Sequence, residues 1–246
     1  TLAHEFQHVV TNDFVTLPHG KDSPESSALG EALSDFFAAV LDYEGNPWQI
    51  NNGNDIVRDI ENAGQGNVLI RKPAHMDDFL KPSFWNKSVG GYSYGFGHRN
   101  STIISHALYL LTEGGVGKGK DKIPVSGIGI NNSAQIVFYA ISKLENNAKF
   151  YEAREAMVDS CNNLAKRGKV HVDHCNQVKN AFAAVGIGSP AKQSLVGPVP
   201  NEPVNKTFRK SPILKWQSYP DVEYFYLTYD SSLWDQTEEV YKSSVN

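Results

Sequence analysis

The first eight residues of the chain carry three side chains whose types and spacing suit metal chemistry. They lie in the segment His4-Glu5-Phe6-Gln7-His8. Residues four apart project from one face of an α-helix, so His4 and His8 can each direct a ring nitrogen to the same ion. Neutral imidazoles bind zinc well, and two of them leave room for a third protein ligand and a water molecule. Glu5 lies beside them and can take the proton of that water.

This motif needs a helix to position it, and the surrounding residues predict one. Residues 1–10 have an amphipathic pattern in which an apolar side lies next to the histidines. The residues of that side are Leu2, Phe6, Val9 and Val10. A chance match to the motif in a loop would lack this pattern, so the helix strengthens the prediction of a metal site.

A pair of carboxylates follows at the same spacing. Glu31 and Asp35 lie four residues apart in a second helical pattern, which runs to Leu41 and ends near Asp42. One of these carboxylates can complete the ligand set. The other can accept a hydrogen bond from the second ring nitrogen of a ligating histidine.

Together the two segments resemble those of the thermolysin family of zinc endopeptidases. Ala3-His-Glu-x-x-His8 is followed by Glu25-Ser-Ser-Ala-Leu-Gly-Glu31-Ala-Leu-Ser-Asp35. The resemblance implies a mainly α fold, the helical C-terminal domain of a thermolysin-like (gluzincin) metalloprotease. It also implies His4, His8 and Glu31 as zinc ligands, Glu5 as the general base, and Asp35 as the partner of the His4 ring. The loop before Glu25 is somewhat longer than is usual in the family, which costs little free energy.

A third segment of the resemblance adds a histidine outside the ligand set. Gly97-His98-Arg-Asn-Ser-Thr-Ile-Ile104 is similar to the family segment that places a histidine ahead of a helix. This implies that His98 hydrogen-bonds the oxyanion of the tetrahedral intermediate. The family has an aspartate shortly before this histidine to orient it, whereas this chain has Ser93. Either Asp77 or Asp78 substitutes for that aspartate, or His98 is less well oriented and the enzyme is slower.

The resemblance also assigns two residues to substrate binding and raises the question of calcium. Arg71 is similar to the arginine that binds a substrate carbonyl, and His19 stands in the place of a tyrosine that assists the oxyanion. The family often binds calcium through carboxylates after the glutamate helix. Here Asp42 remains, but Trp48-Gln-Ile-Asn-Asn52 has amides where acids are expected, which weakens calcium binding. We therefore expect zinc as the cofactor and no tight calcium site.

Composition is that of an ordinary globular protein. The chain has 246 residues, 40% hydrophobic and 20% charged, with a net charge of −4 and a pI of about 6.0. This charge gives no reason to expect nucleic acid, and no apolar run of about 18 residues predicts a membrane span. Because the chain opens inside the motif helix, we expect the N-terminal domain of the family to be missing from it. In the family that domain pairs with the substrate backbone.

Helical patterns continue after the second motif. Residues 45–100 are rich in Gly, Asn, Asp and Pro and predict loops with short helical turns. Apolar residues then return at helical spacing from Asn100 until Gly114-Gly115. Three more helices are predicted, at residues 134–144, 150–164 and 172–185. Cys161 and Cys175 suit a disulfide by count and spacing, and two buried thiols are the alternative.

The chain therefore predicts three parts. Residues 1–188 form the helical catalytic domain. Residues 189–212 are rich in proline and predict a linker, and residues 213–246 predict an aromatic β-type appendage or the start of an accessory module.

These observations favour a secreted or extracellular zinc-dependent endopeptidase that hydrolyses protein or peptide substrates. The alternative is a catalytically impaired metal-binding module of the same fold, structural or interacting with proteins, because Ser93 and the missing domain would leave the site inert. A zinc aminopeptidase is disfavoured by the Asn100 helix segment. A metzincin would need Gly and His where Thr11 and Phe14 stand.

Overall fold

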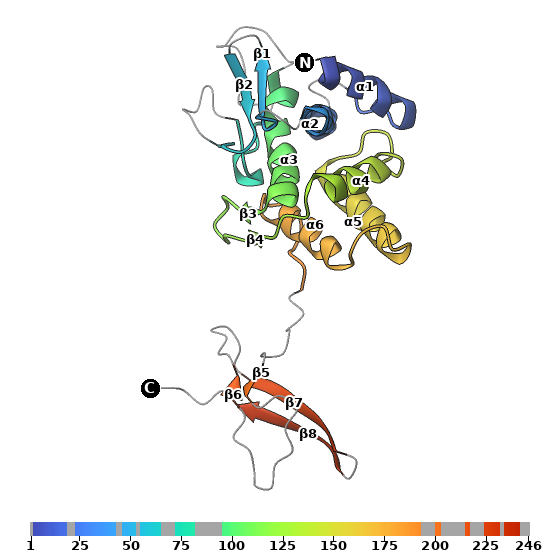
Figure 1. Cartoon of the computed structure of the whole chain (residues 1–246). Coiled ribbons are helices and arrows are strands. Elements are labelled where there is room, and N and C mark those ends of the chain that lie inside the picture. The colour runs from blue at the N-terminus through green and yellow to red at the C-terminus, as the bar shows by residue number, and fades with distance from the viewer. Residues whose placement is uncertain are drawn as a thin grey trace. The chain divides into compact units, whose positions relative to one another are not determined.

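The computed structural model of the chain has two units, Thr1–Ala191 and Lys192–Asn246 (Figure 1). The first is mainly helical, which confirms the predicted fold class, and the second contains short strands. His19, Arg71 and Ser93 lie outside the described residues, so their roles stay predictions. The structure describes residues 2–18, 23–42, 46–52, 55–64, 72–81, 95–192, 200–202, 215–216, 224–231 and 234–241.

Helix α2 (Pro24–Leu41) is the centre of the helical unit. It packs against α1 (Leu2–Phe14) and α3 (Gly95–Glu113), and it also contacts the helices that follow. Residues 26–39 of α2 are all buried, as expected for a helix with apolar or small residues on nearly every side. Its end before Asp42 agrees with the prediction. Its start at Pro24 was not predicted, because the first turns are polar.

The other helices complete the core. They are α4 (Ile130–Ile141), α5 (Phe150–Lys166) and α6 (Asp173–Ala183), close to the predicted segments. Their apolar stripes meet α2 and α3 in one cluster of buried residues. The largest fully buried side chains include Phe36, Phe150 and Phe182.

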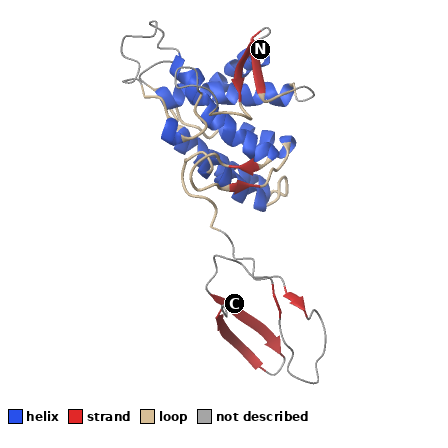
Figure 2. Ribbon diagram, turned by 90° about the vertical axis from the view of Figure 1, so that its left-hand side faces the viewer, coloured by secondary structure: helices blue, strands red, loops and turns tan. Residues whose placement is uncertain are grey.

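Strands in the described part of the helical unit occur as short pairs, on the side that faces the viewer in Figure 2. The elements are β1 (Gln49–Asn52) with β2 (Asp55–Asp59), β3 (Gly115–Val116) with β4 (Pro124–Val125), and the 3-10 turn η1 (Met76–Asp78). The hairpin of β1 and β2 corrects the prediction of loops with helical turns after residue 45. Its Asn and Asp residues gave no strand signal, because they are depleted in strands. Helix α3 also begins before the predicted Asn100.

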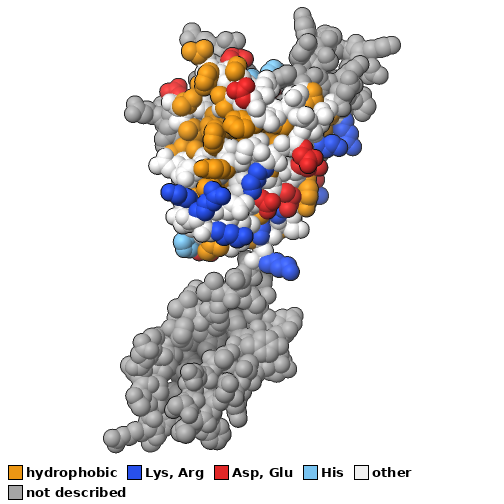
Figure 3. All heavy atoms as spheres, turned by 90° about the vertical axis from the view of Figure 1, so that its right-hand side faces the viewer, with side chains coloured by type: hydrophobic (Ala, Val, Ile, Leu, Met, Phe, Trp, Pro, Cys, Tyr) orange, Lys and Arg blue, Asp and Glu red, His pale blue; other side chains and the backbone are white. Residues whose placement is uncertain are grey.

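Helix α1 meets the core with its polar side. Its buried side is polar and faces α2, while its apolar side is exposed. The buried residues are His4, Gln7 and Thr11, and the exposed ones are Leu2, Phe6 and Val9, at 88%, 60% and 60%. Figure 3 shows hydrophobic side chains gathered on the side of the helical unit that carries α1, α4 and α5. The helix itself was predicted, but the face that meets the core is set by the carboxylates of α2.

The C-terminal unit has two antiparallel pairs among its described residues. They are β5 (Pro200–Glu202) with β6 (Lys215–Trp216), and β7 (Tyr224–Ser231) with β8 (Trp234–Tyr241). The predicted linker and appendage stay predictions. In the part of the chain that the structure describes, no helix combines the length and apolar character needed to cross a membrane.

Helix α3 buries a histidine that must stay neutral. His106 Nδ1 lies 2.9 Å from the carbonyl oxygen of Ile60, and because a carbonyl only accepts, this nitrogen carries the proton. The ring stacks on Tyr109 with 5.7 Å between centroids. Burial lowers the pKa of His106 to about 4, although the bond to Ile60 opposes the shift.

Helices α5 and α6 are joined by a disulfide between Cys161 and Cys175. Both residues are buried, and no cysteine is free. The structure therefore selects the disulfide over the alternative of two buried thiols.

The low pKa of His106 predicts a loss of stability in mild acid. The folded pKa of about 4 lies below the ordinary value of 6.5, so the unfolded chain binds the proton first. The stabilisation is complete above pH 6.5 and is lost as pH falls toward 4, by about 2 kcal/mol at pH 5. The loss is measured as the difference in pH slope between metal-free wild type and a variant without this imidazole, in urea denaturation at pH 7 and pH 5, because His4, whose pKa is raised, affects both slopes alike. His106→Asn keeps a donor but cannot titrate, so its pH slope should be flatter, and an unchanged slope would contradict the assignment.

Removal of the disulfide should also lower the free energy of unfolding. The bridge spans 14 residues, and a loop of that size contributes about 3 kcal/mol by restricting the unfolded chain. The double variant Cys161→Ala/Cys175→Ala should show this loss in urea denaturation, and wild-type protein under reducing conditions should match it. If both retain the stability of the oxidised protein, the disulfide does not stabilise the fold.

Candidate metal centre

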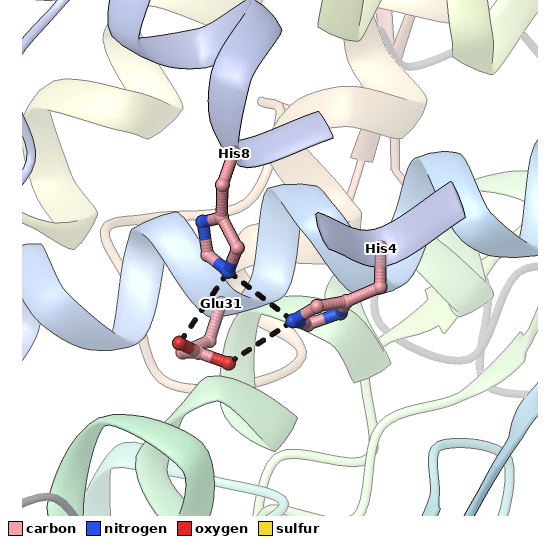
Figure 4. A group of neighbouring side chains, drawn as sticks. All are labelled: His4, His8 and Glu31. Atoms are coloured by element: carbon pink, nitrogen blue, oxygen red, sulfur yellow. Dashed lines mark hydrogen bonds and ion pairs between the residues drawn. The ribbon is translucent and has the colours of Figure 1, made fainter. Parts of the chain in front are cut away.

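Three side chains from two helices converge on one point (Figure 4). His4 and His8 come from α1 and Glu31 from α2. The two Nε2 atoms are 3.2 Å apart. Glu31 Oε2 lies 3.4 Å from His4 Nε2, and Glu31 Oε1 lies 3.6 Å from His8 Nε2. Among the described residues, one group of at least three His, Cys, Asp or Glu side chains lies close enough together to hold a metal ion, and it is this one.

These separations fit a tetrahedral zinc ion. Zinc binds nitrogen at about 2.0–2.1 Å and carboxylate oxygen at about 2.0–2.2 Å, which places two ligand atoms about 3.3–3.5 Å apart. The separation between the two nitrogens, and the separation of each nitrogen from one of the two Glu31 oxygens, lie within that range or close to it. Two imidazoles and one carboxylate also leave a fourth position open, as catalytic zinc sites do. The side chains present therefore suit zinc in both chemistry and spacing.

The charges around the site favour a cation. Burial lowers the pKa of His4, but hydrogen bonds with Asp35 and Glu31 outweigh it and raise the pKa to about 9. Burial raises the pKa of Glu31, but hydrogen bonds with His4 and His98 outweigh it and hold that pKa well below its usual value. At neutral pH the metal-free site thus keeps a proton on His4 between two carboxylates. Zinc needs the neutral ring, so the ion and the proton compete for His4.

Asp35 connects this group to Arg58, a residue that sequence reasoning missed. Asp35 is fully buried, and its Oδ1 lies 2.9 Å from His4 Nδ1. Arg58 Nε and Nη2, from β2, donate to the two Asp35 oxygens at 2.6 Å each. Burial lowers the pKa of Arg58, but the charge of Asp35 outweighs it and raises the pKa. A buried aspartate needs a cationic partner. The sequence therefore implied that Asp35 would have such a partner if buried, but it did not indicate which residue.

His98 and Glu5 lie at the border of the group. His98 is in the first turn of α3, and its Nδ1 lies 2.6 Å from Glu31 Oε2. Its side chain is 51% exposed, so the ring stands between the ligand group and solvent. Glu5 is exposed on α1, and its charge contributes to the raised pKa of Arg58.

Two buried side chains anchor the turn that carries His98. Asn100 Nδ2 donates to the Leu80 carbonyl at 3.0 Å, and the Leu80 N–H donates to Asn100 Oδ1 at 2.9 Å. The Thr102 hydroxyl donates to the Pro73 carbonyl at 2.7 Å. These bonds hold residues 72–81 against the start of α3.

A family profile described as thermolysin metallopeptidase, alpha-helical domain, matches residues 23–187. The chain belongs to the thermolysin metallopeptidase family. Its matched segment includes Glu31, Asp35 and His98 and begins after α1, so the two histidines of α1 stand just ahead of it. The resemblance inferred from the motifs is confirmed, and this is a zinc-dependent family.

Named relatives in the thermolysin family are proteases. Bacillolysin of Bacillus caldolyticus and neutral protease B of Bacillus subtilis (strain 168) are each 31% identical over 76% of this chain. Transglutaminase-activating metalloprotease of Streptomyces mobaraensis is 29% identical over 78% of it. These matches cover 32%, 32% and 26% of the respective relatives. The chain thus spans about a third or less of the curated relatives it matches.

The structure gives less information on the other residues that were assigned from the family resemblance. Asp77, considered with Asp78 as a substitute partner for His98, lies beside His75, with 3.4 Å between Oδ2 and Nδ1, and that role stays a prediction for both. Asp42 is exposed at the end of α2, and the expectation of no tight calcium site stays a prediction. Arg71 and His19 belong to segments outside the described residues.

Replacing Arg58 with methionine should destabilise the metal-free protein by about 3 kcal/mol, because buried Asp35 would lose two charge-assisted hydrogen bonds. Urea denaturation in the presence of a chelator measures the loss. Arg167→Met removes an exposed arginine at the end of α5 and is the matched control, with an expected change below about 0.5 kcal/mol. Equal stabilities of the two variants would rule out a stabilising Asp35–Arg58 pair.

Proposed function

We propose that the chain is the zinc-binding part of a metalloendopeptidase, with His4, His8 and Glu31 as ligands. The observation that carries this proposal is the convergence of two imidazole nitrogens from α1 with the carboxylate of Glu31 from α2, at separations close to those in a tetrahedral zinc site. Family membership supports it, and so do the names of the relatives, which include a neutral protease and a metalloprotease.

Each residue around the ligands has a distinct task in this proposal. When bound, zinc supplies a Lewis acid that polarises a peptide carbonyl and lowers the pKa of a water molecule. Glu5 accepts a proton from the attacking water and delivers it to the leaving amine. His98 donates a hydrogen bond to the carbonyl oxygen as it becomes negative. Asp35, held by Arg58, fixes the Nδ1–H of His4, so that Nε2 is the nitrogen that faces the other ligands.

The proposed substrates are proteins or peptides, and the proposed partner is the N-terminal domain expected from the resemblance. The exposed apolar side of α1 supports such a partner, because contiguous apolar surface marks contact sites. The length of the relatives supports it as well. The disulfide suits a secreted or extracellular protein, since disulfides persist in oxidising compartments. Arg71 and His19 keep their proposed roles in substrate binding and oxyanion assistance.

A metal-stabilised interaction module is the second candidate. It is favoured by the way the ligand group joins α1 to α2 through polar contacts, while α1 leaves its apolar side exposed. A metal ion at this position would hold α1 in place whether or not it served chemistry, because an ion that binds the folded state stabilises it.

A fluorogenic peptide assay on the full zinc-loaded chain separates the two candidates. We expect metal-dependent cleavage that a chelator abolishes, and a drop of about a hundredfold or more in kcat for Glu5→Gln with zinc retained. Asp13→Asn removes another exposed carboxylate from α1 and should leave kcat unchanged.

Two outcomes would overturn the peptidase assignment. One is a zinc-loaded chain that shows no cleavage but gains thermal stability from zinc, which supports the interaction module. The other is cleavage that is equal in wild type, Glu5→Gln and chelated protein, which indicates a contaminating protease. A chain that binds no zinc by elemental analysis would remove the ligand assignment itself.

A further inference from the structure

The first turn of α3 approaches α2 at a point where neither helix has room for a larger side chain. A Cβ added to Gly97 would overlap the hydroxyl oxygen of Ser27 and would lie 3.4 Å from Ser27 Cβ and 3.5 Å from its carbonyl carbon. Gly97 and Ser27 are both buried. Gly97 is helical and has no positive φ, so glycine is needed there for space and not for backbone freedom.

This contact lies directly beside the two residues that bring α3 to the metal centre. Ser27 is one helical turn before Glu31 on α2, and Gly97 immediately precedes His98 on α3. Residues four apart lie on the same face of a helix, so Ser27 and Glu31 both face the start of α3. The separation of the helices at Gly97 therefore controls how near the His98 ring comes to Glu31, which it meets at 2.6 Å.

Three other side chains of this turn form hydrogen bonds to α3 itself or to residues 72–81, and not to α2. Asn100 and Thr102 tie α3 to residues 72–81, and the Ser101 hydroxyl donates to the His98 carbonyl within the helix at 2.9 Å. None of these three contacts sets the distance from α3 to α2. Packing of Gly97 on Ser27 supplies that constraint.

We propose that Gly97 and Ser27 are positioning residues for the metal centre, a pair of small side chains that sets the approach of His98 to Glu31. This inference rests on the proposed function, in which His98 binds the oxyanion. Misplacement of a reacting group by about 1 Å can lower the rate about a hundredfold. The size of these two side chains thus determines how well His98 meets the transition state.

Enlarging Gly97 tests the inference. Gly97→Val adds a Cβ that already touches Ser27 and two methyl groups beyond it, which should push α3 away from α2. We expect a fall of roughly ten- to a hundredfold in kcat with KM nearly unchanged, because the oxyanion hydrogen bond belongs to the transition state. Zinc content should remain at the wild-type level. Gly97→Ala is the milder change if the valine variant does not fold.

Shrinking Ser27 provides the decisive control. Ser27→Gly removes both atoms that the new side chain meets first, so Gly97→Val/Ser27→Gly should regain most of the lost kcat. A general loss of stability would not be reversed by a second glycine in a helix. Gly30→Ala, also on α2, is the matched tolerated change, since its Cβ would lie 3.6 Å from Leu17 Cβ, and it should leave kcat unchanged.

A crystal structure of the zinc-loaded Gly97→Val protein decides the question without turnover. Displacement of the His98 ring from Glu31, reversed by Ser27→Gly, supports the inference even if wild type cleaves no peptide and the proposed function fails. A ring that stays in place overturns it. The inference is also overturned if Gly97→Val keeps the wild-type kcat. It is overturned as well if kcat falls, Ser27→Gly does not restore it and His98 has not moved. Both results leave the peptidase assignment standing.

Discussion

Burial of two carboxylates inside one helix is the constraint on which the rest of the helical unit depends. Glu31 and Asp35 lie in α2 among apolar and small residues, where an unpaired charge would be very unfavourable. Cationic or hydrogen-bonding partners reach them from three neighbouring elements: α1, β2 and α3. The positions of those elements follow from this need, and so does the clustering of the proposed ligands. The same arrangement that makes α2 stable in the core gives a metal ion its charge complement.

The way α1 is attached shows what this constraint costs. A helix docked by apolar burial gains free energy from each methylene that leaves water. Helix α1 instead exposes Leu2, Phe6 and Val9 and contacts the carboxylates of α2 through His4 and His8. Polar contacts of this kind give a small net stabilisation, because they replace bonds to water. Helix α1 is therefore held on α2 by hydrogen bonds and ion pairs more than by apolar packing. Such an attachment orients two imidazoles well, and it leaves the outer face of the helix available.

Local features of the site were predictable, and contacts distant in sequence were not. The spacing of His4 with His8 and of Glu31 with Asp35 is a property of any α-helix, so sequence alone placed each pair on one face. Arg58 escaped prediction because its bond to Asp35 joins residues 23 apart through a polar hairpin with no periodicity. The amphipathic pattern of α1 told which residues share a face but not which face meets the core. The size restriction at Gly97 depends on Ser27, a contact that only the packed helices reveal.

The division of the proposed ligands between α1 and α2 has a consequence for the lifetime of the protein. The two helices follow one another in the sequence, so an ion bound by the proposed ligands would tie α1 to α2. An ion that binds only when α1 is docked on α2 shifts the equilibrium away from local opening of α1 by mass action. A segment that opens locally is where other proteases cut. Zinc supply would then govern turnover of the polypeptide itself, so that protein left without metal is cleared preferentially and the surviving pool is enriched in loaded molecules.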